Sequence, residues 1–274
     1  MLEWSMHSSP SLVETLQRTR RVRRISQLEL ALQLGVSQRH VSFVENGRSR
    51  PSRDLLVAWL QALDAPLALS NEALLAAGYA PAYSEKRLDD PWLAEACVAL
   101  DRLLDTHDPA PALVLDAEWN VVRMNRGAIW LATLLMPSAA AELGQAQVNM
   151  LDLLTHPGGL ADHVTNIEDV GPRFLWMLRN EAAAHPGLQP RAAAYEAYLF
   201  SRIGKTTLPR QGPAPPVLTT RFASPHGPLA FFSMFSTFGT PNDITLTSLR
   251  VEHMFPADDA TRAVVIRYAT GHSA

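Results

Sequence analysis

Between residues 26 and 52 the sequence predicts short helices joined by tight turns, and this pattern is the strongest constraint on the fold. Ser26 and Glu29 have the spacing of a capping box, in which each side chain binds a backbone N–H of the other residue at a helix start. Apolar residues follow at helical spacing up to Gly35, where a residue without Cβ can adopt the positive φ of a sharp turn. Ser37 is then placed to cap a second helix.

Further helices are expected on the C-terminal side of this turn. The second helix is expected over residues 38–45 and ends at Asn46-Gly47. Another helix starts after Pro51-Ser52, and one more is expected over residues 71–77, before Gly78. Helices of about eight residues are marginal alone in water, so they must pack together in one helical domain.

The charge is distributed unevenly along the chain. Residues 1–80 hold 9 arginines and 7 acids, a net charge of +2, whereas the rest holds 15 basic and 20 acidic side chains, a net charge of −5. Five arginines crowd together just before the helical pattern: Arg18, Arg20, Arg21, Arg23 and Arg24. A local basic cluster on an acidic protein suits attraction to phosphates, although a solvated helix face is the alternative interpretation.

A longer pattern covers both predicted helices. Its residues are Ser26-Gln27-Leu28-Glu29-Leu30-Ala31, Leu34-Gly35-Val36-Ser37, Val41-Ser42, Glu45-Asn46-Gly47 and Pro51. It resembles the DNA-binding domain of phage repressors and of the xenobiotic-response-element (XRE) family. The resemblance implies an all-α, five-helix repressor-like domain that binds double-stranded DNA through a helix-turn-helix. It also implies an internal ion pair between Arg20 and Glu45, and Arg24 departs from it because the family often has glycine there.

The expected DNA contacts follow from this resemblance. They are Gln27, Ser37, Gln38, Arg39, Ser42, Phe43, Asn46, Arg48 and Arg50. Gln38 and Arg39 lie in the first turn of the recognition helix, where Gln pairs with adenine and Arg with guanine in the major groove. Phe43 either touches a thymine methyl or belongs to the core. The remaining residues are expected to bind phosphates, which fixes the register on DNA without reading sequence.

The rest of the chain predicts a mixed α+β domain. We expect a helix-turn-helix domain over residues 11–80, a linker over 81–90 and a second domain over 91–270. The expected strands are 112–115, 119–124, 217–223, 229–238 and 246–255, and the expected helices start at Pro91 and Asn125 and cover 162–184 and 189–203. This order predicts a five-stranded antiparallel sheet with helices on one side, a PAS-like plan.

Several stretches of the second domain match a known ligand-binding domain. They are Pro111-Ala112-Leu113-Val114-Leu115-Asp116, Trp119-Asn120-Val121-Val122, Asn125, Asn149-Met150-Leu151 and His226-Gly227-Pro228-Leu229. Over residues 90 to 270 the chain resembles the ligand-binding domain of MmyB-like transcription regulators. The resemblance implies a small apolar ligand, with fatty acids as one class.

A Phe-rich strand offers candidate ligand contacts. In residues 231–238, Phe231 and Phe235 share one face of the strand, and Phe232, Met234 and Phe238 share the other. Both faces therefore require burial, by helices on one side and by a cavity or a subunit on the other. The candidate ligand residues are Phe174, Trp176, Met177, Phe232, Met234 and Phe235, with plain core packing as the alternative.

Enzymatic sequence patterns are missing. Gly204-Lys205-Thr206 is no phosphate loop, since Leu199 stands where the first glycine is required. No nucleophile elbow and no compact set of metal ligands occurs, and Asp258-Asp259 is interpreted as a cap or turn. We expect a transcription regulator that is not an enzyme and needs no metal or cofactor. The alternatives are an antitoxin-type repressor without a ligand and an enzyme domain fused to a DNA-binding domain.

Location and assembly follow from simpler features. The single cysteine, Cys97, excludes an internal disulfide and is typical of a reducing compartment. The first residues lack the regions of a signal peptide, and no apolar stretch reaches about 18 residues. We therefore expect a cytoplasmic protein without a membrane partner. We also expect a homodimer, because one helix-turn-helix reads few base pairs, with Trp92, Leu93, Leu100 and the Phe-rich strand as its contact.

Overall fold

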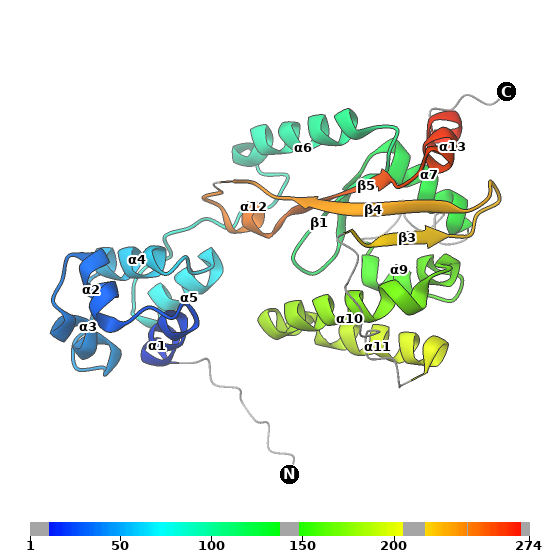
Figure 1. The fold of residues 1–274 in the computed structure, drawn as a ribbon. Helices are drawn as coiled ribbons and strands as arrows, with labels where there is room; N and C mark the ends of the chain where they lie inside the picture. Colours follow the sequence, from blue (N-terminus) through cyan, green and yellow to red (C-terminus); the bar gives the residue numbers. More distant parts are fainter. Residues whose placement is uncertain (1–10, 138–147, 205–216, 240, 270–274) are drawn as a thin grey trace, which may run out of the picture. The chain divides into compact units, whose positions relative to one another are not determined.

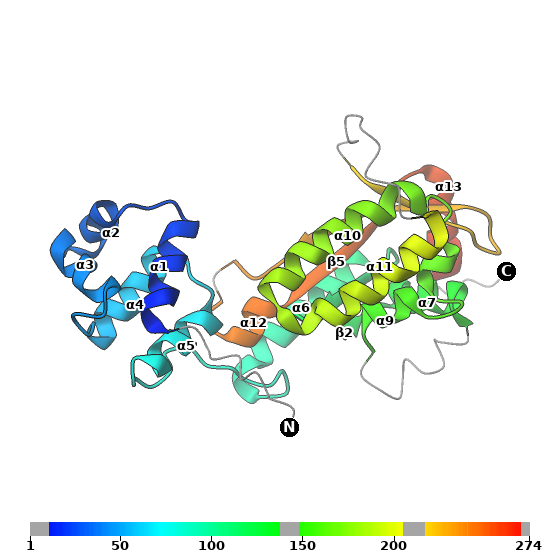
Figure 2. The ribbon, with the colours of Figure 1, turned by 90° about the horizontal axis from the view of Figure 1, so that it is seen from below.

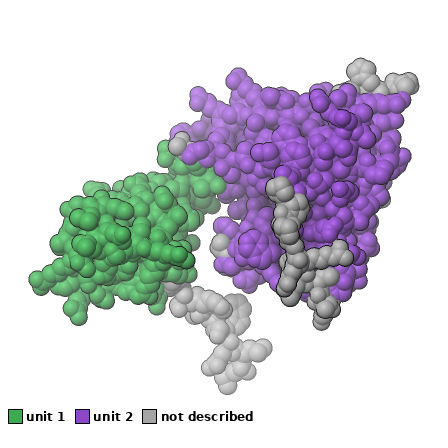
Figure 3. Space-filling view, viewed as in Figure 1, with its two compact units in different colours: residues 1–87, 240–247 green, residues 88–239, 248–274 purple. Residues whose placement is uncertain are grey.

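The computed structural model describes most of the chain, in two compact units. The described residues are 11–137, 148–204, 217–239 and 241–269. The first unit comprises residues 1–87 and 240–247, and the second comprises 88–239 and 248–274 (Figure 3). No sequence pattern predicted that residues 240–247 return to the first unit. Among the described residues, no helix is both long and apolar enough to cross a membrane.

Five helices build the first unit (Figure 1). They are α1 (Leu12–Val22), α2 (Gln27–Leu34), α3 (Gln38–Glu45), α4 (Arg53–Ala62) and α5 (Leu67–Ala76). Each of the first four starts after a serine whose hydroxyl accepts a backbone N–H: Ser11, Ser26, Ser37 and Ser52. The expected capping box at Ser26 is present, and Gly35 ends α2 with a φ of 65°. These starts and stops confirm the predicted helix-turn-helix.

The fifth helix starts earlier than expected. It begins after Pro66, whereas the sequence pattern placed its start at Asn71. Ser70 and Asn71 are typical of a helix start, but the Ser70 hydroxyl instead donates to the carbonyl of Pro66, one turn back within α5. The Asn71 side chain points to the following segment, where it accepts the backbone N–H groups of Ala82 and Tyr83.

The five helices share one apolar core. Its fully buried members come from every helix and include Leu16, Leu30, Val41, Val44, Leu56, Trp59 and Leu74. Each buried side chain of this size contributes roughly 1.5–3 kcal/mol to folding. This core compensates for helices that are too short to be stable alone.

The second unit contains the expected five-stranded antiparallel sheet. Its strands are β1 (Ala112–Leu115), β2 (Val121–Met124), β3 (Thr219–Phe222), β4 (Leu229–Ser236) and β5 (Arg250–Pro256). They lie in the order β2-β1-β5-β4-β3, so the short β1 and the long β5 are central. The fold class is α+β, as predicted.

Helices cover both faces of this sheet, so the expectation of one covered side was wrong. The second unit contains η1 (Pro91–Leu93), α6 (Ala94–His107), α7 (Arg126–Leu135), α9 (Met150–Thr155), η2 (Leu160–His163), α10 (Ile167–Ala184), η3 (Pro186–Leu188), α11 (Gln189–Ile203) and α13 (Asp259–Ala269). In Figure 1, α6 lies on one side of the sheet and α10 with α11 on the other, and Figure 2 shows α10 and α11 in front of β5. All four residues of β1 are consequently buried, because both of its faces are covered.

Several predicted boundaries of the second unit differ in the structure. The strand expected from 246 begins at Arg250, because α12 (Ile244–Ser248) occupies the preceding residues. The carboxylate of Asp243 starts α12 by accepting the N–H of Thr245. The helix expected from 162 begins at Ile167, after the separate turn η2. The second strand begins at Val121, because Trp119 takes a φ of 67° in the turn.

Two helices had no counterpart among the predicted elements. Asn149 caps α9 by accepting the N–H of Leu151. Asp258 accepts the N–H of Thr261 at the start of α13, which confirms its predicted role as a cap.

Candidate nucleic-acid interface and ligand site

The recognition helix α3 presents its first turn to solvent. Val41 and Val44 anchor one side of α3 in the core, whereas Gln38 and Arg39 are exposed. This places the two predicted base-reading side chains at the surface of the unit. An exposed first turn is the part of a recognition helix that enters the major groove.

Phe43 is half-buried and supports Arg39. The guanidinium carbon of Arg39 lies 5.0 Å from the centre of the Phe43 ring, one helical turn away. A cation over an aromatic face at this distance is attracted by about 0.5–1 kcal/mol at an exposed site. Phe43 therefore restricts the directions that Arg39 samples, a role that the sequence interpretation did not include.

Three polar residues predicted to bind phosphates make hydrogen bonds within α3. Ser37 accepts the N–H of His40 at 3.1 Å, which leaves its hydroxyl proton available to a phosphate. The Asn46 amide donates to the carbonyl of Ser42 at 2.8 Å and to the Ser42 hydroxyl at 3.3 Å. Both ends of α3 are thus fixed by side chains that lie at its surface.

An almost fully buried ion pair joins α1 to the recognition helix. Arg20 donates through Nε and Nη2 to the two carboxylate oxygens of Glu45, at 2.6 and 2.7 Å. Gln27 donates to the same carboxylate at 2.7 Å, and Gln17 donates to the Glu45 carbonyl at 2.6 Å. Desolvation of Glu45 would raise its pKa, but the hydrogen bonds from Arg20 and Gln27 lower it overall. The ion pair implied by the family resemblance is confirmed.

The basic cluster is only partly available to DNA. Arg20 is held by Glu45, and Arg23 donates to the carbonyls of Leu63 and Asp64, beyond the end of α4. These two arginines hold α1 to the rest of the unit, because α4 and α3 offer acceptors at their C-terminal ends. Arg18, Arg21 and Arg24 are exposed.

Arg24 occupies a backbone conformation that favours glycine. Its φ is 56°, in the left-handed region, directly before the capping box of α2. This conformation costs an L-residue roughly 1–2 kcal/mol, which is the physical reason why glycine suits this turn.

Two arginines beyond the recognition helix have different environments. Both arginines are exposed, but Arg50 also donates to the carbonyl of Ala77 and lies over the Tyr79 ring at 5.0 Å. Gln27, predicted to bind phosphate, uses one amide N–H on Glu45. The structure thus gives Arg50 and Gln27 roles within the fold, and it leaves Arg48 open to solvent.

The six predicted ligand residues do not gather in one place. Phe174 and Met177 pack into the cluster between the sheet and helices α10 and α11, while Trp176 on the same helix is 69% exposed. Phe232 lies on the opposite face of the sheet and stacks on Phe255, with ring centres 5.3 Å apart. The other two lie further along β4, where Met234 is 57% exposed and Phe235 is 45% exposed.

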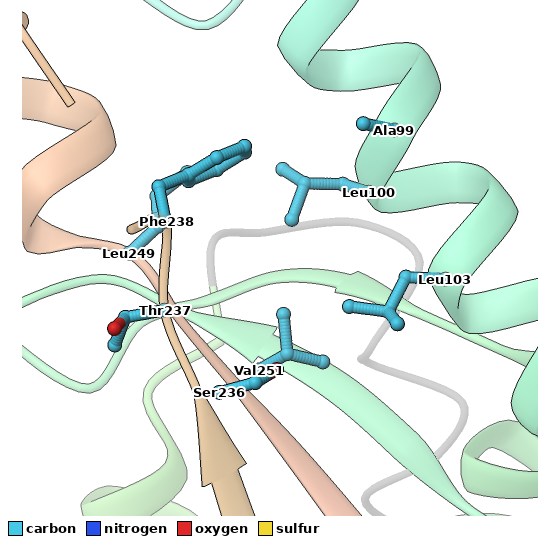
Figure 4. A pocket seen from close by; sticks show the side chains of 8 residues that line it. All are labelled: Ala99, Leu100, Leu103, Ser236, Thr237, Phe238, Leu249 and Val251. Atoms are coloured by element: carbon cyan, nitrogen blue, oxygen red, sulfur yellow. The ribbon is translucent and has the colours of Figure 1, made fainter. Parts of the chain in front are cut away.

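An apolar hollow lies between α6 and the ends of β4 and β5 (Figure 4). Its volume is about 180 Å³, and its lining residues are Ala99, Leu100, Leu103, Ser236, Thr237, Phe238, Leu249 and Val251. Leu100 and Leu103 project from α6 toward the strand ends in this view. Sequence reasoning missed the hollow, because it assigned the apolar residues of the helix that follows Pro91 to a dimer contact and not to a cavity within the second unit.

The connection between β4 and β5 packs with the segment that follows α5. Ser84 donates to the fully buried Asp243 at 2.7 Å, and its carbonyl accepts the N–H of Ile244 at 2.8 Å. Thr245 donates to the carbonyl of Lys86 at 2.6 Å. The two strands that line the hollow are therefore joined by a loop that belongs to the first unit.

The expected dimer contact needs correction. Leu93 and Leu100 are 1% and 3% exposed, so they belong to the core of the second unit and offer no surplus surface. Trp92 is 60% exposed. Of the three residues proposed on this helix, only Trp92 is open to solvent.

Comparison with protein families identifies both units. A helix-turn-helix family matches residues 17–69, and the family of the MmyB-like transcription regulator ligand binding domain matches residues 97–266. A search of curated proteins found no match. Because the second match spans more than half of the chain, the protein belongs to the MmyB-like transcription regulators and is a DNA-binding transcription regulator.

Proposed function

We propose that the second unit senses a small apolar molecule and that this molecule changes the affinity of the first unit for its operator. The observation that carries the proposal is the hollow beside α6, whose lining is almost entirely apolar. Ser236 and Thr237 contribute the few polar groups that orient a ligand in a typical site of this kind.

The volume of the hollow limits the size of the ligand. An engineered cavity of about 150 Å³ holds benzene, and this hollow has about 180 Å³. Fatty acids are the ligand class implied by the family resemblance. Of these, a medium-chain acid fits the hollow better than a long-chain acid, because a long chain fits only if α6 moves away from the sheet.

The loop between β4 and β5 connects the strands that line the hollow to the DNA-binding unit through the polypeptide chain. A ligand that moves Phe238 or Leu249 displaces the two ends of this loop, which binds Ser84 through Asp243. A ligand changes DNA affinity only if it binds with different affinity to the conformation that binds DNA tightly and to the one that binds DNA weakly. The resulting change in DNA affinity is typically 5–150-fold. The Ser84–Asp243 hydrogen bond is our candidate for the contact that transmits this difference.

For DNA recognition, we propose that Gln38 and Arg39 read bases. We propose that Gln27, Ser37, Ser42, Asn46, Arg48 and Arg50 hold the phosphates. Phe43 is proposed to pack against the sugar edge or a thymine methyl while it orients Arg39.

A cytoplasmic homodimer is the proposed working form, because two half-sites give the selectivity that one helix-turn-helix lacks. The DNA-binding and ligand-binding parts are proposed to be divided near residues 81–90. Light scattering at micromolar concentration tests the assembly, and a strictly monomeric mass with and without operator contradicts it.

Operator titrations test the sensor function. A duplex selected by the full-length protein from random sequences is titrated with and without octanoate, decanoate and long-chain acids. We expect one of the medium-chain acids to change the dissociation constant at least about fivefold. Ala99→Trp fills the hollow and abolishes the response, whereas Val98→Trp, on the neighbouring exposed residue outside the hollow, preserves it.

Two outcomes contradict the proposal. An apolar compound that binds tightly but leaves operator affinity unchanged is not a signal for this protein. A panel without any binding supports a repressor that works without a small-molecule ligand.

A further inference from the structure

The C-terminal half of β4 is an open edge of the sheet, which we call the β4 edge (residues 233–237). β3 pairs with β4 only from Leu229 to Phe232, so beyond Phe232 the described residues supply β5 as a neighbour on one side and no strand on the other (Figure 1). Along this edge Met234 is 57% exposed and Phe235 is 45% exposed. An edge strand presents a row of backbone N–H and C=O groups that can pair with another chain.

The alternation along β4 identifies the residues that face the open side. In an antiparallel sheet, the N–H and C=O of one residue point to one neighbouring strand, and those of the next residue point to the other. The carbonyl of Ala230 accepts the N–H of Ala257, directly after β5, so the backbone groups of Ala230 and of every second residue after it point to β5. Those of Ser233, Phe235 and Thr237 consequently point to the open side.

The β4 edge carries none of the usual protections against pairing. Natural edge strands are protected by charged side chains, prolines, bulges or a covering element. Residues 233–237 read Ser-Met-Phe-Ser-Thr, without a charge or a proline, and the register with β5 is regular from Phe231 to Ser236. An exposed apolar edge of this kind is an aggregation hazard unless a specific partner covers it.

We propose that the β4 edge pairs antiparallel with the β4 edge of a second copy of the chain, so that two sheets join into one. This inference rests on the proposed homodimer and assigns its contact. Two antiparallel copies of one strand are related by a two-fold axis, which is the symmetry of most homodimers.

The backbone pattern also assigns the register of this pairing. A two-fold axis at Phe235 places Phe235 opposite the partner's Phe235, and Ser233 opposite the partner's Thr237. In this register all three outward-facing residues of both copies form hydrogen bonds. An axis at Ser233 would instead require Phe231, which already pairs with Thr220 of β3.

A second copy suits the β4 edge better than another segment of this chain does. Self-pairing brings identical residues together, and like charges directly opposite one another are destabilising, so it requires an uncharged strand. Residues 233–237 meet this condition. The segment 205–216, by contrast, is rich in proline, which has no N–H to donate to a neighbouring strand.

The Phe235 side chain is held where it can pack against its counterpart. Its ring centre lies 5.5 Å from the guanidinium carbon of Arg250 on β5, and the hydroxyl of its neighbour on the same face, Ser233, donates to Glu252 at 2.6 Å. Residues directly opposite each other on antiparallel strands have Cβ atoms about 4.5–5.5 Å apart, and aromatic pairs at this spacing stabilise a sheet. Phe235 thus contributes an aromatic pair at the two-fold axis.

The proposed contact adjoins the hollow beside α6. Ser236 and Thr237 line the hollow, and Thr237 is one of the three residues that face the partner. Ligand binding and dimerisation therefore act on the same strand.

Hydrogen exchange on the unaltered full-length protein tests the pairing. The backbone amides of residues 231–238 are followed at single-residue resolution, at protein concentrations below and above the dissociation constant of the dimer from sedimentation velocity. We expect the amides of Ser233, Phe235 and Thr237 to exchange at least about tenfold more slowly in the dimer. Those of Met234 and Ser236 point to β5 and should be protected in both forms.

Charged substitutions then test the register. Phe235→Lys and Phe235→Glu each place like charges opposite one another, so neither variant should dimerise alone, whereas a mixture of the two should form the mixed dimer. The matched control is Ile129→Lys on α7. Ile129 has a similar exposure, 50%, but α7 packs against β1 and β2 at the other end of the sheet, so this variant should remain dimeric.

The possible outcomes separate this contact from the proposed homodimer. Dimers in which Ser233, Phe235 and Thr237 exchange as fast as in the monomer overturn the proposal and leave the homodimer in place. Protection that does not change with concentration also overturns it, because the same chain then covers the edge.

The variants and the assembly state complete the test. Dimers of Phe235→Lys as tight as those of the unaltered protein overturn the contact, and a mixture of the two charged variants that stays monomeric overturns the register. A protein that is strictly monomeric, with and without operator, overturns both the contact and the homodimer. The response of operator affinity to a molecule in the hollow is measured separately, so sensing can fail or succeed independently of these results.

Discussion

Replacing Glu45 by glutamine should destabilise the DNA-binding unit more than any other exchange of a single acid there. The Glu45 side chain is 2% exposed, and Arg20, its partner, is 12% exposed. Removal of one member of a buried ion pair leaves the other charge uncompensated and costs about 3–5 kcal/mol. Glutamine keeps the volume and one acceptor, so we expect the lower end, about 3 kcal/mol.

A loss of this size is large for a unit of this length. About 80 residues correspond to roughly 4–12 kcal/mol of total stability, and about 3 kcal/mol changes the folding equilibrium by roughly 100-fold. Peptide-resolved hydrogen exchange on the full-length protein measures this change in α1 to α4, separately from the second unit. We expect exchange in these helices to accelerate by about two orders of magnitude, while β1 and β5 keep their protection.

The control exchanges an exposed acid of the same unit. Glu72→Gln on α5 removes a charge that is not buried, and such changes cost less than about 0.5 kcal/mol. The double variant Arg20→Met with Glu45→Met should lose less stability than Glu45→Gln alone, because it leaves no buried charge. If Glu45→Gln and Glu72→Gln have the same effect, the ion pair does not hold α1 to α3 and our reasoning is refuted.

Three further predictions concern conformation, recognition and pH. Arg24→Gly should raise the free energy of unfolding by about 1 kcal/mol, because it relieves the positive φ; a loss of stability in chemical denaturation contradicts this. Arg39→Ala should relax the preference at one base pair, whereas Arg48→Ala should weaken binding to all duplexes alike and lower the salt slope by about 1; equal losses on matched and mismatched duplexes for Arg39→Ala exclude base reading. Burial and the charge of His107 lower the pKa of His253, so the unfolded chain binds the proton more readily and the second unit should lose stability as the pH falls below about 6.5. Thermal unfolding at about pH 7 and 5.5 measures this, and the difference should shrink in His253→Gln.

Local sequence patterns were sufficient for α2, α3 and α4 of the DNA-binding unit. The serine caps, Gly35 and the apolar spacing each act within a few residues, so they can be recognised without knowledge of the fold. The role of Arg20 required the family resemblance, because its partner Glu45 lies on another helix.

The fold of the second unit depends on contacts between residues that are distant in the sequence, so local patterns predicted it less completely. The alternation along β4 was predicted correctly, but no local pattern states which helix covers which face. One signal was available, because four consecutive apolar residues in β1 are typical of a strand covered on both sides. The contact between Ser84 and Asp243 joins residues 159 positions apart, and polar side chains of this kind have no recognisable spacing.

The environment of the Arg250 side chain in β5 could not be predicted from the sequence either. Its guanidinium lies over the ring of Trp119, in the turn before β2, and donates to Glu181 of α10. Both partners are far from Arg250 in the sequence. A single arginine in a strand carries no sign that its guanidinium is buried, and only the assembled domain shows it.

The central claim is that ligand binding in the second unit and DNA binding in the first are coupled. Coupling is reciprocal, so the factor by which a ligand changes operator affinity must equal the factor by which operator changes ligand affinity. The direct measurement is the dissociation constant of the most tightly bound medium-chain acid, with and without saturating operator duplex. Our account predicts a change of at least about fivefold that matches the change in operator affinity, and an equal ligand affinity in the two titrations would contradict it.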